Sequence, residues 1–159
     1  MKLKTYTDGG ARGNPGPAAV GVLICDSEGD ILLEHCETIG EATNNVAEYR
    51  ALIEGIKRAK ELGANELECY LDSELVVKQL KGEYKLKNFH LQKLFDEVHK
   101  TEQGLKRVSY THLRREEENM RRADQLVNLA LDEAERNKLS PPRKRGSSGQ
   151  ISGFPPARE

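Results

Sequence analysis

The chain has 159 residues and an almost balanced charge, with 25 Lys and Arg against 26 Asp and Glu. This length suits one globular domain with a substantial hydrophobic core. No apolar run approaches the roughly 18 residues needed for a membrane span, and the sequence opens on an alternating strand pattern rather than a signal peptide. We therefore expect a cytoplasmic protein, monomeric and without a membrane-bound part.

The charge is unevenly distributed along the chain. Residues 1–138 hold 21 Lys and Arg against 25 Asp and Glu, whereas residues 139–159 hold 4 against 1. Nucleic-acid binding usually depends on neutralising phosphates, so an acidic body indicates either another kind of partner or bound cations and a local basic surface. The composition of residues 139–159 is typical of a disordered tail. Its basic run, 143–145, either contacts phosphates or is simply solvated.

Three strands are predicted in the first 39 residues. Alternating or continuous apolar residues indicate strands at 3–8, 18–25 and 31–39. Segment 9–17 is too rich in Gly and Pro for a strand or a helix, and a tight turn at 27–30 joins the second and third strands. We expect the three strands to be antiparallel neighbours.

The three cysteines are odd in number and lack the CxxC spacing of a zinc site. The turn at 27–30 would place Cys25 opposite Leu32 and Cys36 opposite Gly21, so these two thiols are out of register for a disulfide. Buried free thiols are the better interpretation for both and for Cys69.

The rest of the chain alternates helices with strands. We expect the first helix to begin near Thr43–Asn45, to end at Leu62 and to be stopped by Gly63. Later elements are a strand at 67–72, a short helix at 74–81 capped by Ser73, a helix from about 89 to 104, a strand at 105–113 and a helix at 120–138. The predicted fold is α/β, a five-stranded mixed sheet of three antiparallel strands and then two parallel ones, flanked by helices.

Apolar positions predict which face of each helix is buried. The stripe of the first helix includes Leu52, Ile56 and Ala59, and that of the short helix is Leu75, Val76 and Leu80. The third helix carries apolar residues at Phe89, Leu91, Leu94, Phe95 and Val98, and the last at Leu126, Val127, Ala130 and Ala134.

Four acids stand at positions where a fold would not ordinarily place a charge. Asp8 ends the first predicted strand, Glu48 begins the apolar stripe of the first helix, Asp72 closes a later strand, and Asp124 opens the last helix. Each alone has an ordinary explanation, since Asp caps turns and helices and an acid in a first turn favours the helix dipole.

Together the four acids point to a metal site. The carboxyl ends of neighbouring strands share one edge of a sheet, and clustered carboxylates repel unless cations neutralise them. Carboxylate oxygens are ligands for Mg²⁺, and a pair of such ions is the known arrangement for attack on a phosphodiester. The residues therefore predict a site for divalent cations.

With these residues in view, the chain resembles the ribonuclease H family, type 1, in the shorter archaeal-type pattern. The resemblance covers residues 1 to about 138, so it implies a catalytic domain at 1–138 followed by the tail. The stretches that carry it are TDGGARGNPGPA (7–18), TNNVAEYRAL (43–52), LDSELVVKQLKGEYKLKN (71–88) and RRADQLVNLALD (121–132).

The resemblance implies an endoribonuclease that hydrolyses the RNA strand of RNA–DNA hybrids, with duplex RNA as a second candidate substrate. It implies Mg²⁺ or Mn²⁺, two ions with substrate bound, and ends carrying 5′-phosphate and 3′-hydroxyl groups. Asp8, Glu48, Asp72 and Asp124 match the family's catalytic, metal-binding acids. Residues that match substrate-contacting positions are Asn14, Thr43, Asn44 and Asn45; short amide and hydroxyl groups suit a 2′-hydroxyl, which both donates and accepts hydrogen bonds.

The chain also departs from parts of the family pattern. The basic, Trp-containing protrusion of some bacterial members is missing, and Glu74 stands where some members carry Gln near the substrate path. His112 matches a catalytic histidine, but the step from His112 to Asp124 is two residues longer than usual, so a structural role is the alternative. His35, His90 and His99 lack ligand-like spacing and are expected at the surface.

Two other classes of function are compatible with the same scaffold. A non-catalytic hybrid-binding module would be expected to have lost at least one acid, and all four are present. A related exonuclease or DNA-strand transferase would share the acids, but Asn14 and the 43–45 segment favour RNA recognition.

Overall fold

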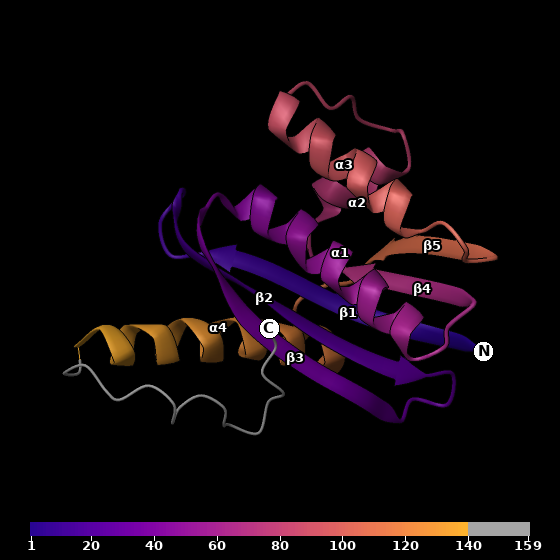
Figure 1. The fold of residues 1–159 in the computed structure, drawn as a ribbon, viewed down its shortest axis with the longest axis horizontal. Coiled ribbons are helices and arrows are strands. Elements are labelled where there is room, and N and C mark those ends of the chain that lie inside the picture. Colours follow the sequence, from indigo (N-terminus) through magenta and orange to yellow (C-terminus); the bar gives the residue numbers. More distant parts are fainter. Residues whose placement is uncertain (140–159) are drawn as a thin grey trace.

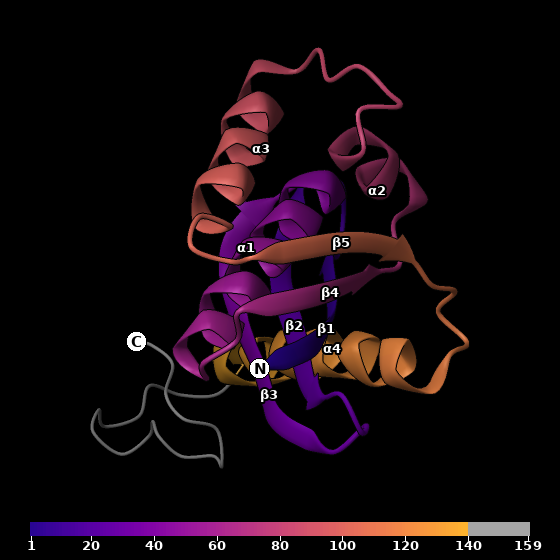
Figure 2. The same cartoon turned by 90° about the vertical axis from the view of Figure 1, so that its right-hand side faces the viewer.

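The computed structural model describes residues 1–139, so the expected disorder of the tail lies outside the described residues. Helix α4 covers one face of a sheet, and α1 covers the other, with α2 and α3 on the α1 side (Figures 1 and 2). No helix in the described part of the chain is long and apolar enough to cross a membrane. The elements are β1 (Lys2–Ala11), β2 (Gly16–Asp26), β3 (Ile31–Ala42), α1 (Asn44–Glu61), β4 (Glu66–Leu71), α2 (Glu74–Leu80), α3 (Phe89–Thr101), β5 (Arg107–His112) and α4 (Glu118–Leu139).

The sheet has the predicted topology. Its strand order is β3-β2-β1-β4-β5. The pairs β1–β2 and β2–β3 are antiparallel, while β4 pairs in parallel with both β1 and β5. β1 is therefore the central strand, where the antiparallel half of the sheet meets the parallel half.

The first two strands are longer than predicted, because the Gly- and Pro-rich segment is largely strand. β1 continues to Ala11, which pairs with Ala18, and β2 begins at Gly16. β1 and β2 continue to pair through this segment because each supplies backbone hydrogen-bond partners to the other. Just beyond the last pair, the Arg12 N–H donates to the Pro17 carbonyl at 2.8 Å. Asp8 consequently lies inside β1 rather than at its end.

Helix α1 forms as its capping and stop signals predict. The Thr43 hydroxyl accepts a hydrogen bond from the Val46 N–H at 3.2 Å, and Gly63 follows the helix with a φ of 103° that favours glycine. All four stripe positions are buried against the sheet, and the first of them is an acid: Glu48, Leu52, Ile56 and Ala59.

The other three helices differ in part from their predicted faces or bounds. In α2, Val76 and Leu80 are buried as predicted, but Val77 is buried and Leu75 is exposed, so the face that packs toward β4 and β5 is rotated slightly from the predicted one. Phe89, the first residue of α3, is exposed, and the Lys93 ammonium lies 5.1 Å from its ring centre. α4 begins at Glu118, so Asp124 lies in its second turn rather than its first.

His35 was expected at the surface, and the structure shows that this was wrong. Its exposed fraction is 0%, and its Nε2 lies 2.6 Å from Glu37 Oε1. The reason is that this face of β3 lies near α1, where Glu54 approaches the same two side chains. His90 and His99 are exposed, as expected.

The cysteines are free, as predicted, and their register differs by one position. Cys25 and Cys69 are buried, and Cys36 is half-buried. Cys36 pairs with Gly21 as expected, whereas an irregularity in the ladder pairs Cys25 with Ile31 instead of Leu32.

Gly21 of β2 lets α4 approach the sheet closely. A Cβ at Gly21 would lie 2.4 Å from the Ala123 carbonyl oxygen. The Cβ position is fixed by the backbone of β2 and the oxygen belongs to the backbone of α4, so no side-chain rotation can relieve the clash. By contrast, a Cβ at Gly10 would lie 3.7 Å from the nearest Val127 methyl group, which is ordinary contact.

We predict that Gly21→Ala destabilises the protein by about 2 kcal/mol, because overpacking against backbone forces α4 outward. The matched substitution Gly10→Ala is expected to change stability by less than about 1 kcal/mol. Urea unfolding of both variants measures the difference. Equal stabilities would mean that α4 is not held by close contact at Gly21.

Candidate active site

The acids are brought together around β1. Thr7 and Leu71 form the last residue pair between β1 and β4, so Asp8 and Asp72 stand next to each other one residue further along. On the β2 side, Asp8 pairs with Gly21, the residue over which α4 packs. β1 extends beyond the last residue of β4, so Asp8 of β1 has no pairing partner on its β4 side.

Glu48 reaches the same edge because α1 lies directly on β1. A Cβ at Gly9 would lie 2.1 Å from the Ala47 carbonyl oxygen, so only glycine permits this approach. The Gly9 backbone N–H faces the Glu48 carboxylate closely enough to lower its pKa, against the larger effect of burial. The glycine that follows Asp8 thus positions the second acid.

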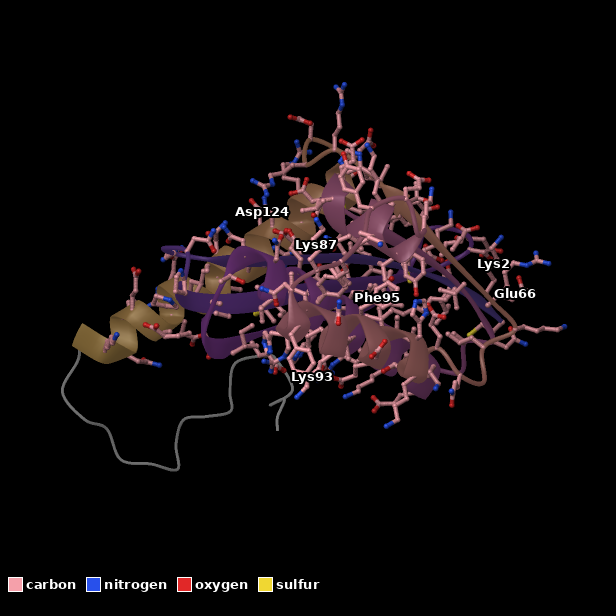
Figure 3. The ribbon with its side chains drawn as sticks, turned by 90° about the horizontal axis from the view of Figure 1, so that it is seen from above. Lys2, Glu66, Lys87, Lys93, Phe95 and Asp124 are labelled. Carbon is pink, nitrogen blue, oxygen red and sulfur yellow. The ribbon has the colours of Figure 1, made fainter. Side chains whose placement is uncertain are left out.

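Asp124 approaches from the other face of the sheet. It lies on the half of α4 nearer to its N-terminus (Figure 3) and follows Ala123, the residue whose carbonyl rests over Gly21. Its side chain is within hydrogen-bonding reach of Asp8. The two glycines therefore bring two helices, one on each face, to the same carboxylate.

The resulting cluster is tight and partly buried. Carboxylate oxygens of Asp8, Glu48 and Asp72 lie within 4.8 Å of one another. Asp8 is 3% exposed and Glu48 8%, whereas the side chains of Asp72 and Asp124 are 16% and 30% exposed. The two inner acids are out of water, and the two outer ones face the solvent.

Burial and mutual repulsion perturb the inner acids. Burial, then the charge of Asp124, raises the pKa of Asp8 from 3.8 to about 8; Asp72 adds to this effect and Arg115 opposes it. Burial, then the charges of Asp8 and Asp72, raises the pKa of Glu48 well above its usual value. At neutral pH the cluster binds protons unless another cation replaces them.

Arg115, in the loop between β5 and α4, is a cation at this cluster. Its Nε and a terminal nitrogen donate to Asp72 Oδ2 at 3.0 and 2.5 Å. Its Nε also lies 3.9 Å from Asp124 Oδ1. Sequence reasoning did not single out Arg115. The signal that could have done so is a cation in the segment that leads into the fourth acid.

The residues present fit a hard divalent cation. Asp8 Oδ1 is buried without a hydrogen-bond partner among the described residues, which is costly for a carboxylate oxygen unless an ion ligates it. The donor set consists of carboxylate oxygens, the ligands that Mg²⁺ and Mn²⁺ prefer. Asp8, Glu48 and Asp72 are the residues that would hold the ion, with Asp124 beside them.

An open cleft of about 490 Å³ lies beside the acids. Asp8, Glu48 and Asp124 line its floor, and Asn44 and Asn45 line its rim. Asp72 lines an adjoining hollow. The acids therefore face a space large enough for a polymer backbone.

Two of the predicted substrate-contacting residues join the β1–β2 turn to the start of α1. The Asn14 side-chain oxygen accepts from the Asn44 N–H at 2.9 Å, and the Asn44 side-chain oxygen accepts from the Ala11 N–H at 2.9 Å. Thr43 caps the helix. Asn45 has no hydrogen-bond partner for its side chain within residues 1–139 and lines the cleft.

Glu74 and His112 lie outside the cleft. Glu74 is in the first turn of α2, and its carboxylate lies 3.5 Å from the Lys78 ammonium. His112 ends β5 and lines the adjoining hollow with Asp72. His112 thus lines the same hollow as Asp72 and does not line the cleft of Asp8, Glu48 and Asp124.

Arg12 and Asn128 also line the cleft, although sequence reasoning did not single them out. The Arg12 guanidinium pairs with Asp132 at 2.8 Å and with Glu135 at 3.1 Å, both on α4. It also donates to the Asn128 side-chain oxygen at 3.1 Å. These contacts attach the β1–β2 turn to α4, and no spacing in the sequence indicates them.

A sheet of this topology with acids converging on its central strand defines a nuclease-type domain, and the comparisons agree. A family described as reverse transcriptase-like matches residues 6–130. The ribonuclease HI of Halobacterium salinarum is 41% identical over 84% of this chain and 66% of its own length. The chain belongs to the ribonuclease H family, type 1.

Solved structures give the same result. The crystal structure of RNase H1 from Halobacterium salinarum superposes with a TM-score of 0.80 at 40% identity, covering 84% of this chain and 99% of that one. LC11-RNase H1, solved in complex with RNA/DNA hybrid, has a TM-score of 0.77 at 42% identity, covering 83% and 98%.

Another relative is considerably longer than this chain. The bifunctional protein Rv2228c of Mycobacterium tuberculosis is 42% identical over 84% of this chain, but the match spans only 36% of that protein. The chain thus corresponds to about a third of this relative.

We predict that Asp8→Asn raises the stability of the metal-free protein and flattens its pH dependence. Because folding raises the pKa of Asp8 from 3.8 to about 8, the folded state binds more protons than the unfolded state in that window. The wild-type protein therefore loses stability as pH rises from about 4 to about 8, and this part of the loss disappears in the variant.

The measurement is urea unfolding in EDTA at several pH values between 4 and 8. Asp96→Asn is the matched control, because Asp96 is an exposed acid on α3, distant in sequence from the cluster. If the free energy of unfolding changes with pH equally in the wild type and in Asp8→Asn, then titration of Asp8 does not destabilise the metal-free protein.

Proposed function

We propose that this chain is an endoribonuclease that hydrolyses the RNA strand of RNA–DNA hybrids with Mg²⁺ or Mn²⁺. The observation that carries the proposal is the convergence of Asp8, Glu48 and Asp72, with Asp124 beside them, where an open cleft meets the hollow that Asp72 lines. Family membership and the hybrid complex of LC11-RNase H1 support the substrate.

The inner acids give the site its dependence on cations. Asp8 and Glu48 are buried and hold protons when no other cation is present, because their charges cannot be solvated there. Two bound ions would supply a water-derived nucleophile and stabilise the leaving 3′ oxygen, leaving 5′-phosphate and 3′-hydroxyl ends. Asp72 and Asp124, which are more exposed, keep the side of the cluster facing solvent open to the backbone being cut.

The amide side chains of Asn44 and Asn45 on the cleft, and of Asn14 in the adjoining β1–β2 turn, provide recognition. Asn14 and Asn44 use their oxygens to join the β1–β2 turn to α1, which leaves their NH₂ groups free to donate to a ligand. Asn45 keeps both its oxygen and its NH₂ group, so it can accept from and donate to a 2′-hydroxyl. This pairing of roles favours RNA over DNA in the strand at the cleft.

A non-catalytic module on the same fold is the alternative from another class. Such a module has no need to bury two mutually repelling acids, whose cost to stability is useful only when cations bind them. The complete set of acids therefore favours catalysis over binding alone.

We predict cleavage of labelled RNA–DNA hybrid in the presence of Mg²⁺ or Mn²⁺, and none in EDTA. Asp8→Asn should lower the rate by at least about a thousandfold, with a circular dichroism spectrum like that of the wild type. Duplex RNA and duplex DNA are tested in parallel; duplex DNA should remain intact. Tight binding of hybrid without cleavage under any of these conditions would identify the binding module instead.

We predict that Asn45→Ala raises the KM for hybrid about tenfold without changing the melting temperature. Its amide makes no hydrogen bond within residues 1–139, so its removal breaks no polar contact of the folded chain and loses hydrogen bonds only to a ligand. Asn44→Ala, the matched neighbour, should raise KM and also lower stability by about 1 kcal/mol, because the Ala11 N–H loses its acceptor. An unchanged KM for Asn45→Ala would remove this residue from the binding site.

A further inference from the structure

Arg115 has an unusual position relative to the acids. Among the described residues, it alone forms ion pairs with any of the four, contacting Asp72 through two nitrogens and lying 3.9 Å from Asp124. Its charge also reaches Asp8 and Glu48, whose pKa values it lowers. The Arg115 charge thus partly neutralises the repulsion among the four carboxylates, as the charge of a metal ion would.

The guanidinium also divides the site. Asp8, Glu48 and Asp124 line the inner cleft, whereas Asp72 lines a second hollow of about 430 Å³. Arg115 is common to the lining of both spaces. It therefore borders both the cleft and the hollow that Asp72 lines, while carboxylate oxygens of Asp72, Asp8 and Glu48 lie within 4.8 Å of one another.

We propose that Arg115 is a built-in competitor of the divalent cation: it occupies the Asp72 and Asp124 side of the site until metal binding displaces it. The inference rests on the metal-dependent hydrolysis proposed above. It assigns Arg115 a positioning role that sets how tightly the protein binds metal before substrate arrives.

Displacement of Arg115 is energetically accessible. Its side chain is 57% exposed, and it belongs to the irregular segment between His112 of β5 and Glu118 of α4. An exposed ion pair contributes little net stability, because water solvates the separated charges. A divalent ion, by contrast, brings twice the charge and ligates several of the acids at once.

The released guanidinium has a new partner available in the substrate. Two parallel N–H donors match the oxygens of a phosphate as well as those of a carboxylate. A hybrid backbone in the cleft would therefore hold Arg115 away from Asp72, which favours metal binding, and bound metal would in turn free Arg115 for the phosphate. Metal and hybrid thus bind cooperatively, and the coupling is reciprocal.

The test measures Mn²⁺ binding without substrate, by isothermal titration calorimetry and by the rise in melting temperature with Mn²⁺. Arg115→Gln is expected to lower the melting temperature in EDTA and to bind Mn²⁺ about three- to tenfold more tightly than wild type, because the competing cation is gone. Arg115→Lys, which keeps the charge, should bind with an affinity between the two.

Arg114→Gln is the matched control, since Arg114 neighbours Arg115 and lines only the outer hollow. It should bind Mn²⁺ with wild-type affinity. Mn²⁺ binding by Arg115→Gln that equals or is weaker than wild type would overturn the proposal, as would an equal gain in Arg114→Gln. If Arg115→Gln does not fold without metal, an affinity of Arg115→Lys at or below that of wild type has the same consequence.

The hybrid supplies a second readout. In wild type, the Mn²⁺ concentration for half-maximal binding should fall about three- to tenfold when an uncleavable hybrid is present, and this gain should shrink in Arg115→Gln. Wild-type protein that binds no Mn²⁺ under any condition would contradict the proposed function itself. Wild-type binding that Arg115→Gln leaves unchanged contradicts only the role of Arg115.

Discussion

The repulsion among buried carboxylates is the constraint on which the rest of this structure depends. Asp8 and Glu48 are almost fully buried, and Asp72 and Asp124 are close enough to raise the pKa of Asp8 further. Such a cluster is stable only when protons, an arginine or metal ions balance it. The elevated pKa of Asp8, the contacts of Arg115 and the proposed metal dependence are three consequences of the same repulsion.

The fold is built to impose that repulsion. Glycines at two adjacent positions of the central hairpin, Gly9 on β1 and Gly21 opposite Asp8 on β2, let the backbones of α1 and α4 approach the sheet. A side chain at either glycine would push a helix, and with it an acid, away from Asp8. Close backbone packing thus holds like charges together, because the burial of apolar side chains of α1 and α4 against the sheet stabilises this arrangement.

The same packing explains why recognition and catalysis lie side by side. Asn14 and Asn44 join the β1–β2 turn to the N-terminus of α1, and Arg12 joins that turn to α4. The turn is therefore attached to both helices that carry acids. A ligand that contacts the amides on the rim is placed against the cluster on the floor without any further movement of the framework.

Local signals in the sequence were sufficient for the order of elements, the cap at Thr43 and the apolar stripe of α1 that begins with Glu48, because each depends on residues a few positions apart. The likeness of its motifs to a known family was enough to nominate the four acids. Local signals failed where a distant partner decided the outcome. The Gly-rich segment after Asp8 became strand because β2 pairs with it, His35 was buried near α1, and α2 turned Val77 inward instead of Leu75. The part played by Arg115 belongs to the same class: only the folded chain brings the segment after β5 against the end of β4, since a contact across 43 residues leaves no periodic trace in the sequence.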